Sequence, residues 1–349
     1  MSRERIIRHQ EGSEPGNGMR CQTCGRENPD SFAFCPICGN ALPRAAEIDR
    51  NAIKAPKEEI AKAVARRTLT DKHLSPTWIF FLIAVLVVTA VVGVSAIFAA
   101  TLDLYKANPD VRPDYQTILD HSRGGIEAIV VGDTIYYVCL GYLVFMLVKR
   151  LNDHFARDDE LRKGILGLVG SASSSGNLKT FVAPELSTME EMDNESLAGE
   201  ERRSPIFWTL LIAVIPMLVT IAFISAAFWG GYSGTLDSLT GLNYLFSLVV
   251  IVFTLYMFNF LGKSMFVHDR RNAAFYSSAR KALSKLGFKP GPPYSAWTLP
   301  ERSFWLYLLL SIVTVGIFTF YWWYSLLKDP NEHFKVQWQF EDNLMSTLQ

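Results

Sequence analysis

The sequence predicts a small metal-stabilised head followed by an all-α polytopic membrane domain. The chain has 349 residues, of which 49% are hydrophobic, and its formal net charge is +0. Polar residues fill the first 75 positions, and long runs with almost no charge follow them. This segregation is typical of a membrane protein that carries a soluble head. The neutral overall charge gives no argument for binding nucleic acid.

The head is predicted by four cysteines in two C-x-x-C pairs, each followed by glycine: Cys21, Cys24, Cys35 and Cys38. Each pair sets two thiolates on one tight turn, and the glycine lets the backbone curl beneath the sulfurs. Two such turns supply a tetrahedral structural zinc site with no position left for substrate. Disulfides or a redox site are the alternative. We disfavour them because no export signal precedes the cysteines and cytosolic thiols stay reduced.

Residues 19–43 resemble the short zinc-ribbon family found at the N-termini of many prokaryotic membrane proteins. The resemblance is carried by the paired cysteine turns, by Glu27-Asn28-Pro29 after the first turn, and by Phe34 before the second. It implies one structural zinc and a protein partner, and it implies no reaction.

Five apolar runs predict about five transmembrane helices. The first, Thr77–Ala100, carries no charge and would be roughly 36 Å long as a helix, enough to cross a ~30 Å hydrocarbon core. The other runs lie at about 129–148, 206–230, 242–261 and 303–327. Because the first run begins only at Thr77, no signal peptide is expected.

The remaining segments complete the predicted domain division. Residues 44–75 should form a helical stalk or linker, with a membrane-surface helix as the alternative. Residues 170–203 are rich in Ser and Gly and then acidic, and they predict a flexible linker. The full division is a disordered lead at 1–18, the ribbon at 19–43, the stalk at 44–75, a first helical hairpin with a cytoplasmic extension at 76–169, the linker at 170–203, a second hairpin at 204–290, and a C-terminal membrane segment and tail at 291–349.

Orientation follows from the Lys and Arg residues of the connections. They are numerous in 149–205 and 262–302, outnumbered by acids in 101–128, and absent from 231–241. The positive-inside rule therefore predicts a multi-pass protein of the cell membrane with a cytoplasmic N-terminus.

A short repeat marks the ends of three apolar runs. Each end reads Lys-x4-His, with the histidines at His154, His268 and His333. This repeat predicts helical hairpins whose second helix leaves the membrane as an amphipathic extension. The histidines are candidates for a metal or proton site, but anchoring at the membrane interface is the commoner role, and we expect it here. Asp133 is an intramembrane candidate that we expect to reach the outer interface.

The C-terminal run contains Thr314-Val-Gly316-Ile317-Phe318, followed by Tyr-Trp. It resembles a prokaryotic integral-membrane domain family of unknown function, although Phe318 stands where that family usually has tyrosine. A single span over 303–327 would place the C-terminus outside. The Lys-x4-His repeat would place it inside, which needs a re-entrant hairpin broken at 314–316. We expect the single span, because one uninterrupted apolar helix is the simpler structure.

No known catalytic motif is present, so we expect no enzyme and no catalytic or cofactor-binding residues beyond the four zinc ligands. The expected function is display of the zinc ribbon in the cytoplasm for protein–protein interaction or assembly. The alternative is a small transporter or channel component whose ribbon is a regulatory or structural head. The expected partners are the lipid bilayer and a cytosolic or membrane protein, with a homo-oligomer left open.

Overall fold

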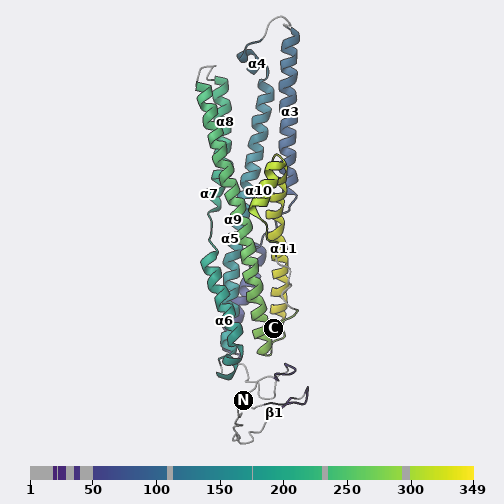
Figure 1. Ribbon diagram of the computed structural model, residues 1–349, viewed down its shortest axis with the longest axis vertical. Coiled ribbons are helices and arrows are strands. Elements are labelled where there is room, and N and C mark those ends of the chain that lie inside the picture. The colour runs from purple at the N-terminus through teal and green to yellow at the C-terminus, as the bar shows by residue number, and fades with distance from the viewer. Residues whose placement is uncertain are drawn as a thin grey trace, which may run out of the picture.

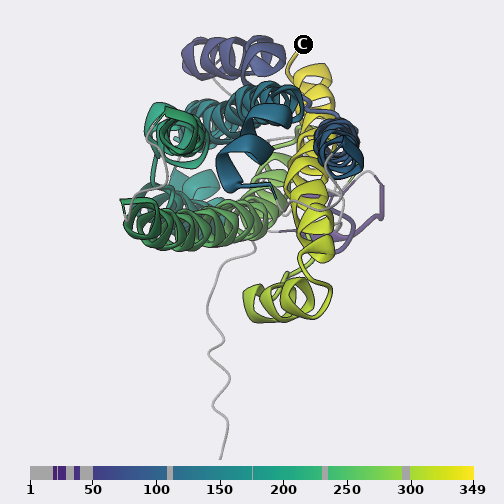
Figure 2. The same ribbon diagram turned by 90° about the horizontal axis from the view of Figure 1, so that it is seen from above.

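Long helices that run side by side form the body of the molecule (Figures 1 and 2). The computed structural model describes residues 19–21, 23–28, 35–39, 50–107, 113–174, 176–229, 235–292 and 299–349. Four helical segments in these ranges are long and apolar enough to cross a membrane. They are α3 (Trp78–Ala107), α5 (Arg123–Ala172), the continuous run α7 (Pro205–Thr209), η1 (Leu210–Val214) and α8 (Ile215–Trp229), and α9 (Thr235–Lys285). The predicted all-α polytopic membrane domain is therefore confirmed.

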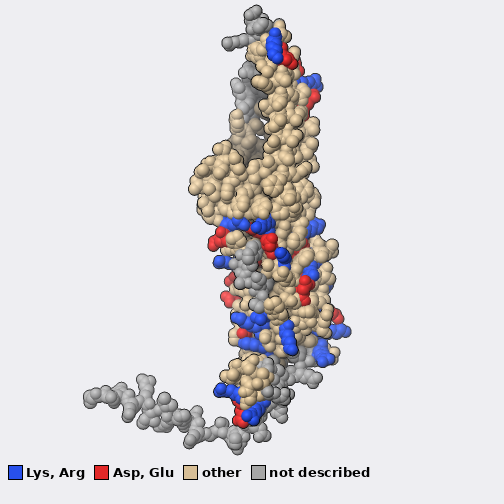
Figure 3. Space-filling model, turned by 90° about the vertical axis from the view of Figure 1, so that its right-hand side faces the viewer, with Lys and Arg blue, Asp and Glu red and all other residues tan. Residues whose placement is uncertain are grey.

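Two of these helices are much longer than a membrane is thick. α5 has 50 residues and α9 has 51, so each extends about 75 Å. Their first parts lie in an apolar half of the molecule. Their later parts lie in what we call the charged half: the portions of α5, α9 and α11 that follow Lys149, Lys263 and Lys328, together with α1 and α6. Figure 3 shows the Lys, Arg, Asp and Glu side chains gathered on this half, beneath a nearly charge-free surface.

Small residues let α3 and α5 pack closely. A Cβ on Gly93 would lie 2.3 Å from Ile129, and one on Gly132 would lie 2.0 Å from the Thr89 hydroxyl oxygen. Gly125 is buried in the same contact, where a Cβ would lie 2.8 Å from the Ile97 backbone nitrogen. This contact includes the first turn of α5, which begins at Arg123, before the predicted start of the span at about residue 129. Contacts of this small-residue kind are a main source of helix association in membranes.

Replacing Gly132 with leucine should force α3 and α5 apart. Overpacking of a tight contact costs about 1–3 kcal/mol, so the midpoint of thermal unfolding in detergent should fall. Gly124→Leu is the matched control, because a Cβ there meets nothing within 4 Å. An equal fall for both variants would contradict the close contact.

The segment predicted to be a flexible linker, 170–203, is instead mostly helical. α5 continues to Ala172, and α6 (Gly176–Gly199) returns alongside α9. Leu178, Val182 and Met189 are fully buried against that neighbour, at spacings that set them on one helix face. The linker prediction was wrong because apolar side chains at helical spacing dock this acidic segment against α9, with Leu186 and Met192 partly buried in the same contact.

Val182→Asp should release α6 and make it the first site of limited proteolysis. A buried carboxylate without a partner is strongly unfavourable in this apolar contact. Leu197→Asp is the control, since Leu197 lies on the same helix but is exposed. If the wild-type chain is cut within α6 as fast as the Val182 variant, the docked helix is contradicted.

The fifth apolar run does not form a single span. It forms α10 (Phe304–Val313), a turn, and α11 (Ile317–Leu348). α10 covers only about 15 Å, half of a hydrocarbon core, so the hairpin enters the apolar half and returns to the same end. Both limbs are joined at their polar ends, because Arg302 binds both carboxylate oxygens of Asp329 at 2.5 and 2.8 Å. The single-span expectation was therefore wrong, and the re-entrant alternative is the one observed.

The hairpin turn satisfies its own backbone groups, as it must at apolar depth. The amide of Gly316 donates to the Ser311 carbonyl at 2.7 Å, and the amide of Val315 donates to Ile312 at 3.1 Å. The Thr314 hydroxyl donates to Leu310 and accepts from the amide of Phe318. Gly316 has φ +88°, a left-handed conformation that glycine adopts without strain. The Thr-x-Gly pattern is thus the chemical signature of this turn.

The predicted stalk is also part of the bundle. α1 (Lys54–Ala65) buries Ile60 and Ala63 against α5, where Gly164 leaves room for the Ile60 side chain. A short helix α2 (Arg67–Thr70) leads on to α3, and α4 (Tyr115–His121) lies between α3 and α5, with Asp114 accepting a hydrogen bond from the Thr117 amide at its start. The predicted disordered lead, 1–18, lies outside the described residues.

Candidate metal centres

The first centre is the cysteine cluster near the N-terminus. Two short antiparallel strands, β1 (Met19–Arg20) and β2 (Glu27–Asn28), flank the first C-x-x-C turn. In each turn the glycine amide donates to the carbonyl of the first cysteine: Gly25 to Cys21 at 2.9 Å and Gly39 to Cys35 at 2.8 Å. Both glycines have positive φ, +71° and +72°, as the backbone curl requires.

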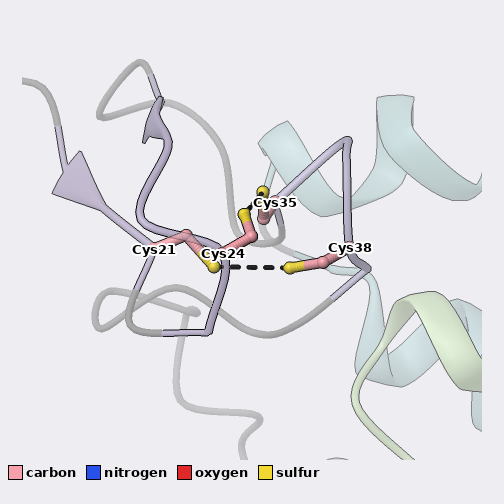
Figure 4. A group of neighbouring side chains, drawn as sticks. All are labelled: Cys21, Cys24, Cys35 and Cys38. Atoms are coloured by element: carbon pink, nitrogen blue, oxygen red, sulfur yellow. Dashed lines mark hydrogen bonds between the residues drawn. The ribbon is translucent and has the colours of Figure 1, made fainter.

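The four sulfurs converge on one point (Figure 4). Sγ atoms lie 3.4 Å apart in the pairs Cys21–Cys38 and Cys24–Cys35, and all four lie within 4.8 Å of one another. Zinc–sulfur bonds of about 2.3 Å place tetrahedral sulfurs about 3.8 Å apart, so the set fits a zinc ion with little adjustment. Burial raises the pKa of Cys35, but the backbone amides of Cys38 and Ile37 outweigh it and lower that pKa to about 6. A thiolate is the form that binds metal.

The second centre is a set of three histidines that the sequence placed far apart. His154 lies on α5, His268 on α9 and His333 on α11, and their exposed fractions are 0%, 0% and 1%. One nitrogen from each ring lies within 4.8 Å of the others. The ring centroids form a nearly equilateral triangle with sides of 5.0, 5.2 and 5.2 Å. The expectation that these side chains anchor the protein at the membrane interface was wrong, because they face one another inside the bundle.

Each of these rings is backed by a carboxylate on Nδ1. His154 contacts Asp71 at 3.0 Å, His268 contacts Glu200 at 2.7 Å, and His333 contacts Asp269 at 2.6 Å. An ionised carboxylate only accepts hydrogen bonds, so each Nδ1 carries a proton. The three Nε2 atoms therefore point away from the carboxylates, and those of His154 and His268 lie 3.0 Å apart.

A second polar ring lies one helical turn further along the same helices. Asp158, Asn272 and Gln337 follow the three histidines at i+4, and all are fully buried. The Gln337 amide nitrogen donates to Asp158 at 2.6 Å, which turns its oxygen toward His333 Nε2 at 3.1 Å. The Tyr276 hydroxyl donates to the same Asp158 oxygen at 2.5 Å. The repeat is therefore Lys-x4-His-x3-polar, and its last position is the signal that sequence reasoning missed.

Buried arginines connect this cluster to the rest of the charged half. Arg157 binds Asp71 at 2.8 Å and Glu341 at 2.5 Å, with all three side chains fully buried. Burial alone would raise the pKa of Asp71, but the contacts of this carboxylate with His154 and then with Arg157 hold that pKa well below its usual range. Arg162 pairs with Asp158 and also binds Asp193 at 2.9 Å. These pairs join α2, α5, α6 and α11 around the histidines.

Arg150 has a different role. Proline has no amide proton, so Pro330 leaves the carbonyl of Leu326, one turn earlier, without its helical partner. Arg150 donates to that carbonyl at 2.8 Å and to the Asn331 side chain at 3.0 Å. Asn331 in turn donates to the Leu74 carbonyl at 2.8 Å. A buried charge thereby replaces the missing backbone hydrogen bond at the point where α11 passes into the charged half.

The other predicted candidate, Asp133, does not join either centre. It lies on α5 in the apolar half, partly buried, about six turns before His154. The structure therefore brings together the four cysteines and, separately, the three histidines.

Comparisons with known families agree with both ends of the chain. Residues 20–42 match the zinc-ribbon domain, which together with the cysteine geometry identifies a structural zinc site. Residues 302–340 match a domain of unknown function, DUF4234. That match covers α10, the Thr314–Gly316 turn, the Arg302–Asp329 pair and His333. No curated protein and no solved structure matches the chain.

Proposed function

We propose that this protein anchors a zinc ribbon at the cytoplasmic surface of the cell membrane and presents it to a protein partner, without catalysing a reaction. The observation that carries the proposal is that the ribbon, the charged half and the C-terminus lie on the same side of the apolar half. The ribbon strand β1, helices α1 and α6, and the C-terminus all lie at the same end of the molecule (Figure 1).

The even number of crossings supports this arrangement. Four spans return the chain to the side on which it began, and the α10–α11 hairpin enters and leaves on that side. The charged half carries most of the described Lys and Arg residues (Figure 3), and positive charge favours the cytoplasmic side. A reducing cytosol also suits four zinc-bound thiolates.

The ribbon itself is suited to recognition rather than to chemistry. Four sulfurs close the coordination sphere of a zinc ion, so no position remains for a substrate. The second cysteine turn presents Ile37 with 62% of its surface exposed, between Cys35 and Cys38. A branched apolar side chain fixed on a rigid metal-held turn is a natural anchor for a partner surface.

The test is to place a photo-crosslinking side chain at Ile37 in the full-length protein in native membranes. We expect a specific crosslinked protein, and Ile37→Glu should abolish co-purification of that protein while the ribbon keeps its zinc. The matched control is the same probe at Leu197, an exposed leucine on α6. Equal crosslinking from both positions, or no effect of Ile37→Glu, would contradict the proposal.

A further inference from the structure

We propose that His154, His268 and His333 hold a second metal ion, a divalent first-row transition metal such as zinc, where α5, α9 and α11 leave the apolar half. This site is separate from the ribbon, and it does not depend on the function proposed above. Its ligand atoms are the three Nε2 nitrogens, and no sulfur takes part.

The directions of the histidine lone pairs favour a bound cation. Every Nδ1 proton is taken up by Asp71, Glu200 or Asp269, so a neutral ring presents a lone pair at Nε2. The lone pair of His268 accepts a hydrogen bond from the Asn272 amide nitrogen at 3.0 Å. Yet the Nε2 atoms of His154 and His268 lie 3.0 Å apart. Two lone pairs at that distance repel each other, and one cation bound by both removes the conflict.

The same conflict recurs at the third histidine. His333 Nε2 lies 3.1 Å from the side-chain oxygen of Gln337, which is also an acceptor. Rotating the Gln337 amide by half a turn would break the hydrogen bond that its nitrogen donates to Asp158 at 2.6 Å. Two oxygens could complete the coordination of a cation held by the three nitrogens. One is this Gln337 oxygen, and the other is an Asp158 oxygen that lies 3.9 Å from His268 Nε2.

The balance of charge around the histidines also favours a divalent cation. Four carboxylates contact the histidines or Gln337: Asp71, Asp158 and Asp269 are buried, and Glu200 is partly buried. Two guanidinium groups contact those carboxylates, Arg157 and Arg162, and each is shared with a further acid. Four carboxylates against two guanidinium groups leave an excess of two negative charges in a largely buried region, before the acids that share the arginines, Glu341 and Asp193, are counted. Uncompensated buried charge is strongly unfavourable, and a divalent ion supplies the missing charge.

The arrangement of the three histidines also matches known metal chemistry. Zinc–nitrogen bonds of about 2.0–2.1 Å place tetrahedral nitrogens about 3.4 Å apart. The Nε2 atoms of His154 and His268 lie 3.0 Å apart, and one nitrogen from each of the three rings lies within 4.8 Å of the others. Histidine ligands of metals almost always donate their other nitrogen to a carboxylate or carbonyl, which fixes the tautomer and orients the ring. All three rings have that carboxylate. A nitrogen and oxygen ligand set of this kind suits zinc and its neighbours in the first transition row.

The burial of the site points to a structural ion. The ligands come from three helices, and each sits at the exit of an apolar segment, at the histidine of a Lys-x4-His repeat. One ion would cross-link α5, α9 and α11 at the level where the re-entrant hairpin returns. Without an ion, His333 Nε2 needs a proton to donate to Gln337, and either His154 or His268 needs one at Nε2 to donate to the other. Doubly protonated histidine rings are therefore the alternative to a bound metal.

Metal analysis of the full-length chain, purified in detergent with its affinity tag removed, distinguishes these accounts. We expect the wild type to hold about two zinc ions. The variant with Cys21, Cys24, Cys35 and Cys38 all changed to serine should hold about one. X-ray absorption of that variant should show only nitrogen and oxygen neighbours, near 2.0–2.1 Å. This measurement leaves the histidines intact, so it does not depend on a destabilised variant.

In the same cysteine-free ribbon background, His268→Gln should lose the remaining zinc, and His73→Gln should keep it. His73 is the matched control because it is an exposed histidine that packs on the rings of Phe334 and Trp338 at a similar level. The proposal is overturned if the monodisperse cysteine-free ribbon variant, supplied with zinc, retains none, or if His268→Gln retains as much as His73→Gln.

Discussion

Replacing Cys35 with serine is expected to unfold the zinc ribbon while the helical bundle stays folded. The described part of the ribbon has two strands of two residues, and its only buried apolar cluster is Cys21 with Cys35. A segment this small cannot bury enough surface to fold alone. Zinc binding supplies about 10–16 kcal/mol in comparable small domains, so losing one ligand should remove most of the folding energy.

The outcome can be read separately for the two parts of the protein. The first tryptophan of the chain is Trp78, so tryptophan fluorescence reports only the bundle. The Cys35 variant should lose one equivalent of zinc and be cut by protease before residue 50, while the fluorescence melting curve stays in place. Cys139→Ser is the control and should change neither zinc content nor cleavage. Full zinc content in the Cys35 variant would refute the assignment of this ligand.

The second large effect is expected at Arg157. Its guanidinium lies between the carboxylates of Asp71 and Glu341, and all three side chains are fully buried. Arg157→Met fills the same space but leaves two buried carboxylates without their shared partner. Breaking a buried pair in this way costs about 3–5 kcal/mol. Urea unfolding of the detergent-solubilised chain should therefore shift strongly to lower concentration.

Arg66→Met is the matched control for this prediction. Arg66 also pairs with an acid from α5, Glu160, but both side chains are more than 40% exposed. Exposed pairs contribute about 0–1 kcal/mol, so this variant should unfold close to the wild type. Equal shifts for the two arginines would mean that the buried network does not stabilise the charged half.

The four spans could be predicted because bilayer thickness alone sets the length of an apolar run. The length of the apolar run could not decide between a hairpin and a single span at 303–327. Hydropathy does not distinguish one span of 25 residues from two half-spans, and the information lies in the backbone at Thr314 and Gly316. Those residues were recognised as a break, but the internal hydrogen bonds that make a turn tolerable at apolar depth become visible only in three dimensions.

Helix α6 was missed for a related reason. Four glutamates and one aspartate make α6 acidic, and it follows the Ser-rich stretch 171–175, so average composition predicts a linker. Docking depends instead on the positions of a few apolar residues, Leu178, Val182 and Met189, and on a partner surface supplied by α9. That surface is distant in sequence, so no local pattern reveals it.

The cysteine centre was predictable because its ligands are close in sequence and their spacing is a direct consequence of zinc geometry. The histidine centre depends on three helices meeting. The Lys-x4-His repeat was visible, but a histidine beside a lysine at a helix exit is also what an interfacial anchor looks like. The polar residues at i+4, Asp158, Asn272 and Gln337, mark the inward face, because an interfacial anchor needs no polar partner one turn further along.

The ribbon and the charged half are both expected to face the cytoplasm, and cysteine labelling in sealed vesicles tests this most directly. Single cysteines at Lys54, Ser346 and Asp103 would be introduced into a Cys139→Ser chain whose ribbon thiolates are protected by zinc. A membrane-impermeant maleimide should label positions 54 and 346 only in inside-out vesicles, and position 103 only in right-side-out vesicles. Labelling of position 346 only from the outer face would contradict both the re-entrant hairpin and the shared cytoplasmic side.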